Sequence, residues 1–249
     1  MKISIITVCL NSENTIEKTI NSVIQQKYKN IEYIVVDGNS TDNTKYILSK
    51  YKKFINKFIS EKDSGIYNAI NKGLNHATGD LISILHSDDC YFNEDTLGNV
   101  VKIFGNNKSV ECLFGTTIIK RGDGKIIRKY SPVGFKPLML YLGISPPHPS
   151  MFLKKEVYKK YGIYKEHYKI AGDFEFYLRI LRKKKINYKI IDDTYVVMQH
   201  GGVSTRSLKS NFISSKEILN SFKENNIYNN WFIILLRFPY KIMQFIFRK

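Results

Sequence analysis

The sequence predicts an α/β fold with a mixed, mainly parallel β-sheet flanked by helices. Short apolar stretches rich in β-branched residues alternate, over residues 3–85, with stretches whose apolar side chains recur at helical spacing. The connections between them are short, which is typical of strand–helix–strand units. Each strand-like stretch is continuously apolar, as expected of parallel strands that are buried on both faces.

The first part of the chain supplies four predicted strands, at residues 3–10, 31–36, 58–60 and 81–85. A helix is predicted between each pair of consecutive strands. The first helix has one apolar face and a possible capping box formed by Asn14 and Glu17. The second follows Ser40, and the third starts at Ile66 and stops before the segment Thr78-Gly79-Asp80.

After Asn93 the strand-like and helix-like stretches no longer alternate regularly. Residues 110–120 and 125–130 flank the turn-forming segment 121–124, which predicts a hairpin. Residues 146–149 form a proline-rich loop, residues 171–182 a helix, residues 195–198 a strand and residues 209–224 another helix. No repeat or low-complexity tract interrupts this order, so we predict one domain followed by a C-terminal tail.

The chain is strongly basic, with 39 Lys and Arg against 22 Asp and Glu, a net charge of +17. Such a charge suits nucleic acid, an anionic membrane or phosphorylated substrates, although a solvated lysine-rich surface explains it equally well. The three cysteines are far apart and support neither a disulfide framework nor a zinc site. With no export signal in the sequence, we expect a cytoplasmic location.

Polar clusters follow the first, second and fourth predicted strands, at Asn11, Asp37 and Asp88-Asp89. In open parallel sheets, ligands bind beyond the carboxyl ends of the strands. Two adjacent carboxylates at a strand end repel each other, and a divalent cation resolves that conflict. Taken alone, however, the Ser-Asp-Asp segment is better explained as a helix cap, and Asp37 fits a turn as well as a ligand contact.

The order of several motifs decides between these interpretations. Over roughly residues 1–205 the chain resembles family 2 glycosyltransferases, in the segments Thr7-Val8, Asn11, Asp37-Gly38-Asn39-Ser40-Thr41-Asp42, residues 61–73, Ala77-Thr78-Gly79-Asp80 and Ser87-Asp88-Asp89. The resemblance implies a GT-A fold over residues 1–207. Its nucleotide-binding half spans about residues 1–92 and its acceptor half about residues 93–207.

The resemblance also implies roles for individual residues on the donor side. Thr7, Val8 and Asn11 would line the nucleotide, Asp37 would hold the base or ribose, and Asp63 would complete the uracil-side wall. Lys72 would face the diphosphate, or would equally be a solvated lysine. Asp88 would approach the ribose or the metal, and Asp89 would bind Mn²⁺ or Mg²⁺ directly, so that the cation neutralises the departing diphosphate.

An inverting transfer needs a general base for the acceptor hydroxyl. Asp173 begins a predicted helix, and the residues alone leave open whether it caps that helix or takes part in catalysis. The resemblance favours catalysis, because the family places its base at an acidic helix start. Glu175 is the competing acid, since many relatives carry two adjacent acids where this chain has Asp-Phe-Glu.

Two histidines are further candidates. His148 lies in Pro146-Pro147-His148-Pro149, where relatives often have His-Gln, and is predicted to contact the donor sugar or acceptor. His200 precedes two glycines in a segment that suits a closing loop, and could reach the metal or a phosphate. As a lone histidine, His200 is more often structural.

Residues 208–249 are predicted to form a helical C-terminal extension. Beyond residue 230, apolar residues including Trp231 and Ile234 share one face, and Arg237, Lys241, Gln244 and Arg248 form a polar stripe. This pattern, with the net charge, favours a helix in an anionic membrane interface over one docked on the domain or a second copy. It is too interrupted by charge and by Pro239 to span a membrane.

These observations lead to a hypothesis of function. We expect an inverting glycosyltransferase that moves a sugar, from UDP-hexose or UDP-N-acetylhexosamine, to a lipid-linked or growing glycan in capsule or lipopolysaccharide synthesis. The enzyme would lie in the cytoplasm, on the inner face of the membrane. A sugar nucleotidyltransferase is the alternative, but the turn after the first strand lacks the glycine-rich loop that it needs. Nucleic-acid binding rests on charge alone and is not expected.

Overall fold

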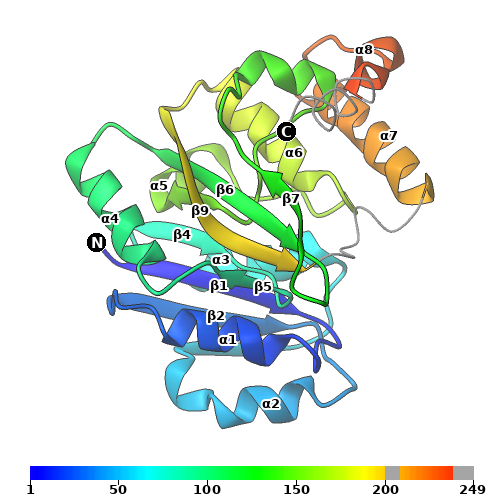
Figure 1. Ribbon diagram of the computed structural model, residues 1–249. Helices are drawn as coiled ribbons and strands as arrows, with labels where there is room; N and C mark the ends of the chain where they lie inside the picture. The colour runs from blue at the N-terminus through cyan, green and yellow to red at the C-terminus, as the bar shows by residue number, and fades with distance from the viewer. Residues whose placement is uncertain (200–207, 238–249) are drawn as a thin grey trace.

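The computed structural model describes residues 1–199 and 208–237. Within these residues a nine-stranded mixed sheet has the order β3-β2-β1-β4-β8-β6-β9-β5, and β7 pairs with β6 (Figure 1). Its strands are β1 (Ile3–Cys9), β2 (Ile31–Asp37), β3 (Lys57–Ser60), β4 (Leu81–Ile84), β5 (Asp89–Tyr91), β6 (Cys112–Lys120), β7 (Ile126–Tyr130), β8 (Met151–Lys154) and β9 (Tyr188–Gln199). The predicted α/β class with a mixed sheet is confirmed.

The helices flank this sheet. They are α1 (Ile16–Ile24), α2 (Thr44–Lys50), η1 (Lys52–Phe54), α3 (Ile66–His76), α4 (Thr96–Asn106), η2 (Pro137–Leu142), α5 (Lys155–Tyr161), α6 (Gly172–Tyr177), η3 (Leu178–Lys183), α7 (Leu208–Glu224) and α8 (Trp231–Leu235). The π-helical η3 continues α6, so residues 172–183 form one helical segment, one residue further along the chain than the predicted helix at 171–182.

Strands β3, β2, β1 and β4 are parallel, and their connections contain α1, α2 and α3. Alternate residues of β1 enter different cores. Ile6 and Val8 pack with α3, whereas Ile3 and Ile5 pack with α1 and α4. The strand is therefore buried on both faces, which explains why its sequence is continuously apolar. The capping box predicted at Asn14 is wrong, because α1 begins after Thr15 and has no side-chain cap.

In the second half of the sheet, β6 and β7 form the predicted antiparallel hairpin around residues 121–124. Strand β9 is longer than predicted, since it pairs with β6 along most of its length and also with β5. Strands β5 and β8 and helices α4 and α5 were not predicted from the sequence. The two antiparallel pairings of β8, with β4 and β6, join the parallel half to the second half.

The C-terminal helices pack on the domain beside α6 (Figure 1). Ile218, Phe222 and Ile234 enter the same core as Phe174. Arg237, predicted as part of a polar stripe of a membrane-interface helix, is instead only 3% exposed and packs against α7. Among the described residues no helix is long and apolar enough to cross a membrane. The rest of the predicted amphipathic stretch, residues 238–249, lies outside the described residues, and membrane binding stays a prediction.

Candidate functional site

The turns after β1, β2 and β4 meet at one edge of the sheet. The backbone N–H of Asn11 donates to Ser40 Oγ over 2.8 Å, and Asn11 Oδ1 accepts from the N–H of Thr41 over 2.9 Å. The hydroxyls of Ser12 and Ser87 lie 2.9 Å apart. Because parallel strands end at a common edge, polar clusters far apart in the sequence become neighbours. The convergence expected from the sequence is therefore present.

Asp37 ends β2 and is fully buried. Its carboxylate accepts hydrogen bonds from the backbone N–H and hydroxyl of Ser40, and from Ser60 Oγ over 2.7 Å. Three strands thus converge on this side chain, since β1 and β3 pair with β2 at Asp37. These bonds hold the turn, and the contact predicted between Asp37 and a base or ribose stays a proposal.

Asp63 returns to this edge as predicted. A Cβ on Gly38 would lie 2.4 Å from Asp63 Oδ2, so the absence of a side chain at Gly38 admits the carboxylate. Asp63 Oδ1 also accepts from the N–H of Gly65, which orders the entry to α3. The half-buried carboxylate therefore lies directly over the turn that Asp37 closes.

The other residues predicted to bind the donor differ in how far their side chains are exposed to solvent. Thr7 and Val8 are buried, and Thr7 Oγ1 accepts from the hydroxyl of Tyr33. Asn11 is exposed and adopts a left-handed backbone conformation with φ 49°. Lys72 Nζ forms a 2.9 Å salt bridge with Glu61 and donates to the carbonyl of Lys62. Lys72 thus fixes the segment before Asp63, and its predicted contact with the diphosphate stays a proposal.

The Asp88-Asp89 pair follows β4. Asp89 is 1% exposed, and neither of its carboxylate oxygens has a hydrogen-bond donor in the described part of the chain. Burial, together with the adjacent Asp88 carboxylate, raises the pKa of Asp89 well above its usual value. An isolated buried carboxylate is costly, and a hard divalent cation is the partner that suits it.

The number of protein ligands near this pair is small. Residues 1–199 and 208–237 contain no group of three or more His, Cys, Asp or Glu side chains able to hold a metal. A cation at Asp88 and Asp89 would therefore take further oxygen ligands from a bound diphosphate or from water. His200, the other predicted metal ligand, lies outside the described residues.

His148 lies beside the Asp88-Asp89 segment. Its ring stacks on that of His86 with centroids 5.9 Å apart, and its Nε2 lies 2.9 Å from the hydroxyl of Tyr164. Burial, and then the neighbouring His86, lower the pKa of His148 to about 3. His148 is therefore neutral at physiological pH and offers a hydrogen bond rather than a charge.

An aromatic layer links this side of the site to Asp173. Tyr164 stacks on Tyr67 with centroids 5.7 Å apart. The Tyr67 hydroxyl donates to the carbonyl of Ile170 over 2.7 Å and accepts from the N–H groups of Gly172 and Asp173. Tyr67 is in the first turn of α3, just after the Asp63 segment. A side chain of α3 thus holds the backbone that carries Asp173.

A second side chain holds the same loop from the opposite direction. Glu217 of α7 accepts from the backbone N–H groups of Lys169, Ile170 and Ala171 over 2.8–2.9 Å. With Tyr67, it satisfies five consecutive amides that precede or open α6. Such bonds fix the loop, because each amide would otherwise lose its hydrogen-bond acceptor. The helix α7 is therefore part of the support for Asp173.

Asp173 and Glu175 have different surroundings. Asp173 accepts from the N–H of Phe174, and burial raises its pKa to about 6. Glu175 is fully buried and pairs with Arg179 over 3.0 Å and with Lys165 over 3.2 Å. A carboxylate held by two cations is committed to structure. Of the two competing acids, only Asp173 has its carboxylate at a cavity.

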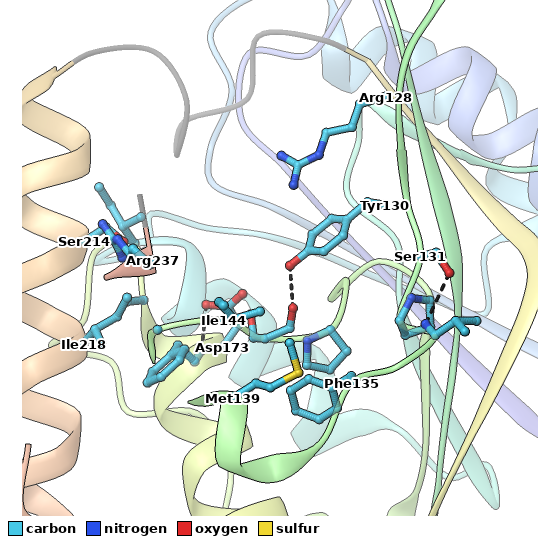
Figure 2. Close-up of a pocket in the computed structure, with 18 residues that line it drawn as sticks. Arg128, Tyr130, Ser131, Phe135, Met139, Ile144, Asp173, Ser214, Ile218 and Arg237 are labelled. Carbon is cyan, nitrogen blue, oxygen red and sulfur yellow. Dashed lines mark hydrogen bonds between the residues drawn. The ribbon is translucent and has the colours of Figure 1, made fainter. Parts of the chain in front are cut away.

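That cavity has a volume of about 200 Å³. Figure 2 shows Asp173 at its base, with Arg237 on one side and Arg128 above Tyr130 on another. Apolar side chains, among them Phe135, Met139, Ile144 and Ile218, also line it. Its walls come from the β7 region, the loop before α6, and the C-terminal helices.

Several residues around Asp173 were not predicted from the sequence. Tyr67 lies within the motif that suggested the resemblance, but nothing in its spacing indicates that it reaches Asp173. Arg128, Tyr130 and Glu217 belong to segments whose only signal was secondary structure. The placement of Glu217 depends on a contact between residues 46 positions apart, the Glu217–Ala171 bond, and that of Tyr130 on its bond to the Ser145 carbonyl.

The sequence profile described as Glycosyl transferase family 2 matches residues 4–187. The chain belongs to this family. An uncharacterized glycosyltransferase of Mycobacterium tuberculosis (strain CDC 1551 / Oshkosh) is 32% identical over 178 residues, which are 71% of this chain and 68% of that protein. A PGL/p-HBAD biosynthesis glycosyltransferase of Mycobacterium bovis (strain BCG / Pasteur 1173P2) is 26% identical over 179 residues, with the same coverage. Family 2 membership decides against the sugar nucleotidyltransferase alternative.

Solved structures support the GT-A fold of this family 2 chain. S. aureus TarS 1-349 in complex with UDP-GlcNAc superposes with a TM-score of 0.67 at 23% identity, covering 88% of this chain and 67% of that one. The mannosyltransferase PcManGT from Pyrobaculum calidifontis, in complex with GDP-Man and Mn²⁺, gives 0.66 at 19% identity, covering 90% and 63%. This family 2 chain thus spans about two thirds of the length of these relatives.

Proposed function

We propose that this chain is an inverting glycosyltransferase that moves a sugar from a nucleotide diphosphate to a glycan hydroxyl. The observation that carries the proposal is Asp173, which lines a cavity and whose backbone segment is held by Tyr67 of α3 and Glu217 of α7. The donor would bind where the turns after β1, β2 and β4 meet, with Asn11, Asp37 and Asp63 toward the nucleoside. UDP-hexose or UDP-N-acetylhexosamine is the proposed donor.

Asp88 and Asp89 are the proposed ligands of Mn²⁺ or Mg²⁺. The buried Asp89 carboxylate, without a hydrogen-bond donor among the described residues, fits a cation better than it fits the apolar interior. A divalent cation bound there supplies charge neutralisation for the diphosphate leaving group. The relative PcManGT was solved with Mn²⁺, which supports this choice of metal.

In the proposed reaction, Asp173 accepts the proton of the acceptor hydroxyl as its oxygen attacks the anomeric carbon. The bond to the diphosphate breaks on the opposite side, so the configuration at the anomeric carbon inverts. A base of pKa about 6 is ionised at neutral pH and still takes up a proton readily. Neutral His148 offers a hydrogen bond to the donor sugar or the acceptor at the same edge.

The pH dependence of transfer follows from Asp173. Burial raises the pKa of this group to about 6, and only its ionised form accepts a proton. We expect kcat/KM to increase as pH passes through about 6 and to level off above it. An ordinary aspartate would place this limb near ~4. The pH–rate profile of the purified enzyme measures it, and a limb near the ordinary value would rule out Asp173 as the titrating base.

Replacing Tyr67 by Phe tests the support of Asp173. The change removes the hydroxyl that accepts from Gly172 and Asp173 and donates to Ile170. Because misplacing a reacting group by about 1 Å costs on the order of 100-fold, we expect kcat to fall about 10- to 100-fold while UDP binding is retained. Tyr46→Phe, at a residue that is 64% exposed on α2, is the control. Equal kcat values for the two variants would contradict the role of Tyr67.

We further propose a cytoplasmic enzyme on the inner face of the membrane, held there by the C-terminal segment and acting on a lipid-linked or growing glycan of a capsule or lipopolysaccharide. A relative named for PGL/p-HBAD biosynthesis supports a role in glycan assembly. Incubation with a panel of UDP-, GDP- and dTDP-sugars, with and without Mn²⁺, tests the proposal. Metal-dependent hydrolysis or transfer from one of them is expected, and binding of none would refute it.

A further inference from the structure

A histidine beside the proposed metal ligands has a ring nitrogen that the reaction proposed above does not use. We infer that His86 donates a hydrogen bond from its Nε2 to an oxygen of the transferred sugar, and so helps to select the sugar nucleotide. The inference rests on the proposed function, because it takes Asp88 and Asp89 as the metal–diphosphate site and Asp173 as the base. It adds a residue that recognises the sugar between them.

His86 is held by the turn that carries the metal ligands. It follows β4, and its carbonyl accepts from the N–H of Asp89 over 3.0 Å. Its ring stacks on that of His148, with centroids 5.9 Å apart and planes inclined by 24°. His148 is fixed in turn by the hydroxyl of Tyr164, which lies 2.9 Å from its Nε2. Contacts within the protein therefore set the orientation of the His86 ring.

The two ring nitrogens of His86 have different surroundings. Nδ1 is buried and has no hydrogen-bond partner among residues 1–199 and 208–237. Nε2 has no partner among these residues either, but it is not a buried atom, and the residue is half-buried. A proton on Nδ1 would be a buried donor without an acceptor, in the neutral ring and in the charged one, and such donors are rare. The ring is therefore neutral with its proton on the accessible Nε2.

This arrangement is costly for a residue that serves packing alone. A buried polar atom without a partner is unfavourable, and an apolar side chain of similar shape would avoid the cost. Such an atom in a folded protein calls for an explanation. A ligand that accepts from the His86 Nε2–H supplies one, because an apolar side chain could not donate to it.

Ring contacts lead from His86 to the proposed base. Tyr164, which bonds to His148, stacks on Tyr67 with centroids 5.7 Å apart. The Tyr67 hydroxyl lies 3.4 Å from Asp173 Oδ1. In the proposed reaction the transferred sugar lies between the diphosphate and the acceptor hydroxyl, which is the interval that these rings span. His86 is at the end of the row next to the diphosphate.

A role as a metal ligand fits His86 less well. Carboxylate, carbonyl and water oxygens are the ligands that suit Mg²⁺ and Mn²⁺. In the described part of the chain no three His, Cys, Asp or Glu side chains are grouped as a metal site, so His86 is not gathered with Asp88 and Asp89 around one cation. A sugar hydroxyl or an acetamido carbonyl, by contrast, accepts a hydrogen bond from a neutral imidazole. The group that His86 recognises is therefore an uncharged oxygen of the sugar.

Nitrogen-15 NMR of the enzyme labelled in its histidines measures the contact directly. With UDP and Mg²⁺ bound, the His86 ring should carry its proton on Nε2. Exchange of UDP for a UDP-hexose or UDP-N-acetylhexosamine that the enzyme binds should shift the Nε2 and proton signals further. A proton on Nδ1, or signals that do not respond to the sugar, would overturn the inference.

Variants test the same contact by calorimetry. His86→Phe keeps an aromatic ring to stack on His148 but has no donor. We expect its affinity for the UDP-sugar to fall about 3- to 10-fold, as for the loss of one hydrogen bond, and its affinity for UDP to stay unchanged. His86→Gln, whose amide N–H reaches a similar position, should recover part of the loss. His76→Phe, at an exposed histidine of α3, is the matched control.

The outcomes separate this inference from the proposed function. Equal losses of affinity for UDP and for the UDP-sugar in His86→Phe, or no loss for either, would overturn the inference. If His86→Phe does not fold, the ring signals of the wild type decide. Failure of the wild type to bind UDP and every UDP-sugar tested would instead refute the proposed function.

Discussion

Asp173→Asn is expected to reduce the rate of glycosyl transfer about 10²–10⁴-fold, the range over which a general base contributes, and to leave UDP affinity unchanged. Asparagine keeps the shape of the side chain and still accepts the hydrogen bond from Phe174 N–H. It has no carboxylate to take the proton of the acceptor hydroxyl. Initial rates with excess acceptor, beside UDP titration by calorimetry, separate the two effects.

Glu175→Gln is the matched control for this prediction. Its carboxylate pairs with Arg179 and Lys165 and accepts from Asn225, so the change weakens a buried ion-pair network. We expect a lower melting temperature, because breaking a buried pair costs about 3–5 kcal/mol, and retained transfer per folded molecule. If Asp173→Asn kept full activity, or if folded Glu175→Gln lost it, the base would have to be reassigned to Glu175.

Asp89→Asn is expected to abolish metal-dependent donor binding and, at the same time, to stabilise the metal-free protein. The Asp89 carboxylate is 1% exposed and has no donor among residues 1–199 and 208–237. Removing a buried charge of this kind should raise the free energy of unfolding by about 1–3 kcal/mol. The same change removes a ligand of the cation, so UDP affinity in Mn²⁺ should fall at least about 100-fold.

Two measurements on the Asp89→Asn variant test whether donor binding is lost while stability increases. Thermal melts with and without Mn²⁺ plus UDP report stability, and calorimetry reports UDP affinity. Asp95→Asn, at a residue whose side chain is 54% exposed near the start of α4, should change neither by much. A variant that is less stable than the wild type without metal, and that still binds UDP in response to Mn²⁺, would show that Asp89 is a structural residue.

The donor side of the site could be predicted from the sequence because topology alone places it. Once β1, β2 and β4 are parallel neighbours, the residues that follow them must share an edge, and the 2.9 Å approach of Ser12 to Ser87 reflects this. Asp173 could be proposed only through a resemblance, since its sequence fits a helix cap equally well.

The support of Asp173 could not be predicted in the same way. Tyr67 bonds the backbone of Asp173 across 106 positions and Glu217 bonds that of Ala171 across 46 positions, and neither contact leaves a periodic trace in the sequence. Arg237 illustrates the opposite error. Helical spacing placed it on a polar stripe, but packing of α8 on the domain buried it in the wall of a cavity.

The anomeric configuration of the product is the most direct test of the proposed reaction. Transfer from a UDP-α-linked sugar in Mn²⁺, followed by proton NMR of the anomeric signal, distinguishes a single displacement from a double one. With Asp173 as a base and no covalent intermediate, the new linkage should be β. An α-linked product would show that the configuration is retained, and would contradict the assignment of Asp173 as the base of an inverting transfer.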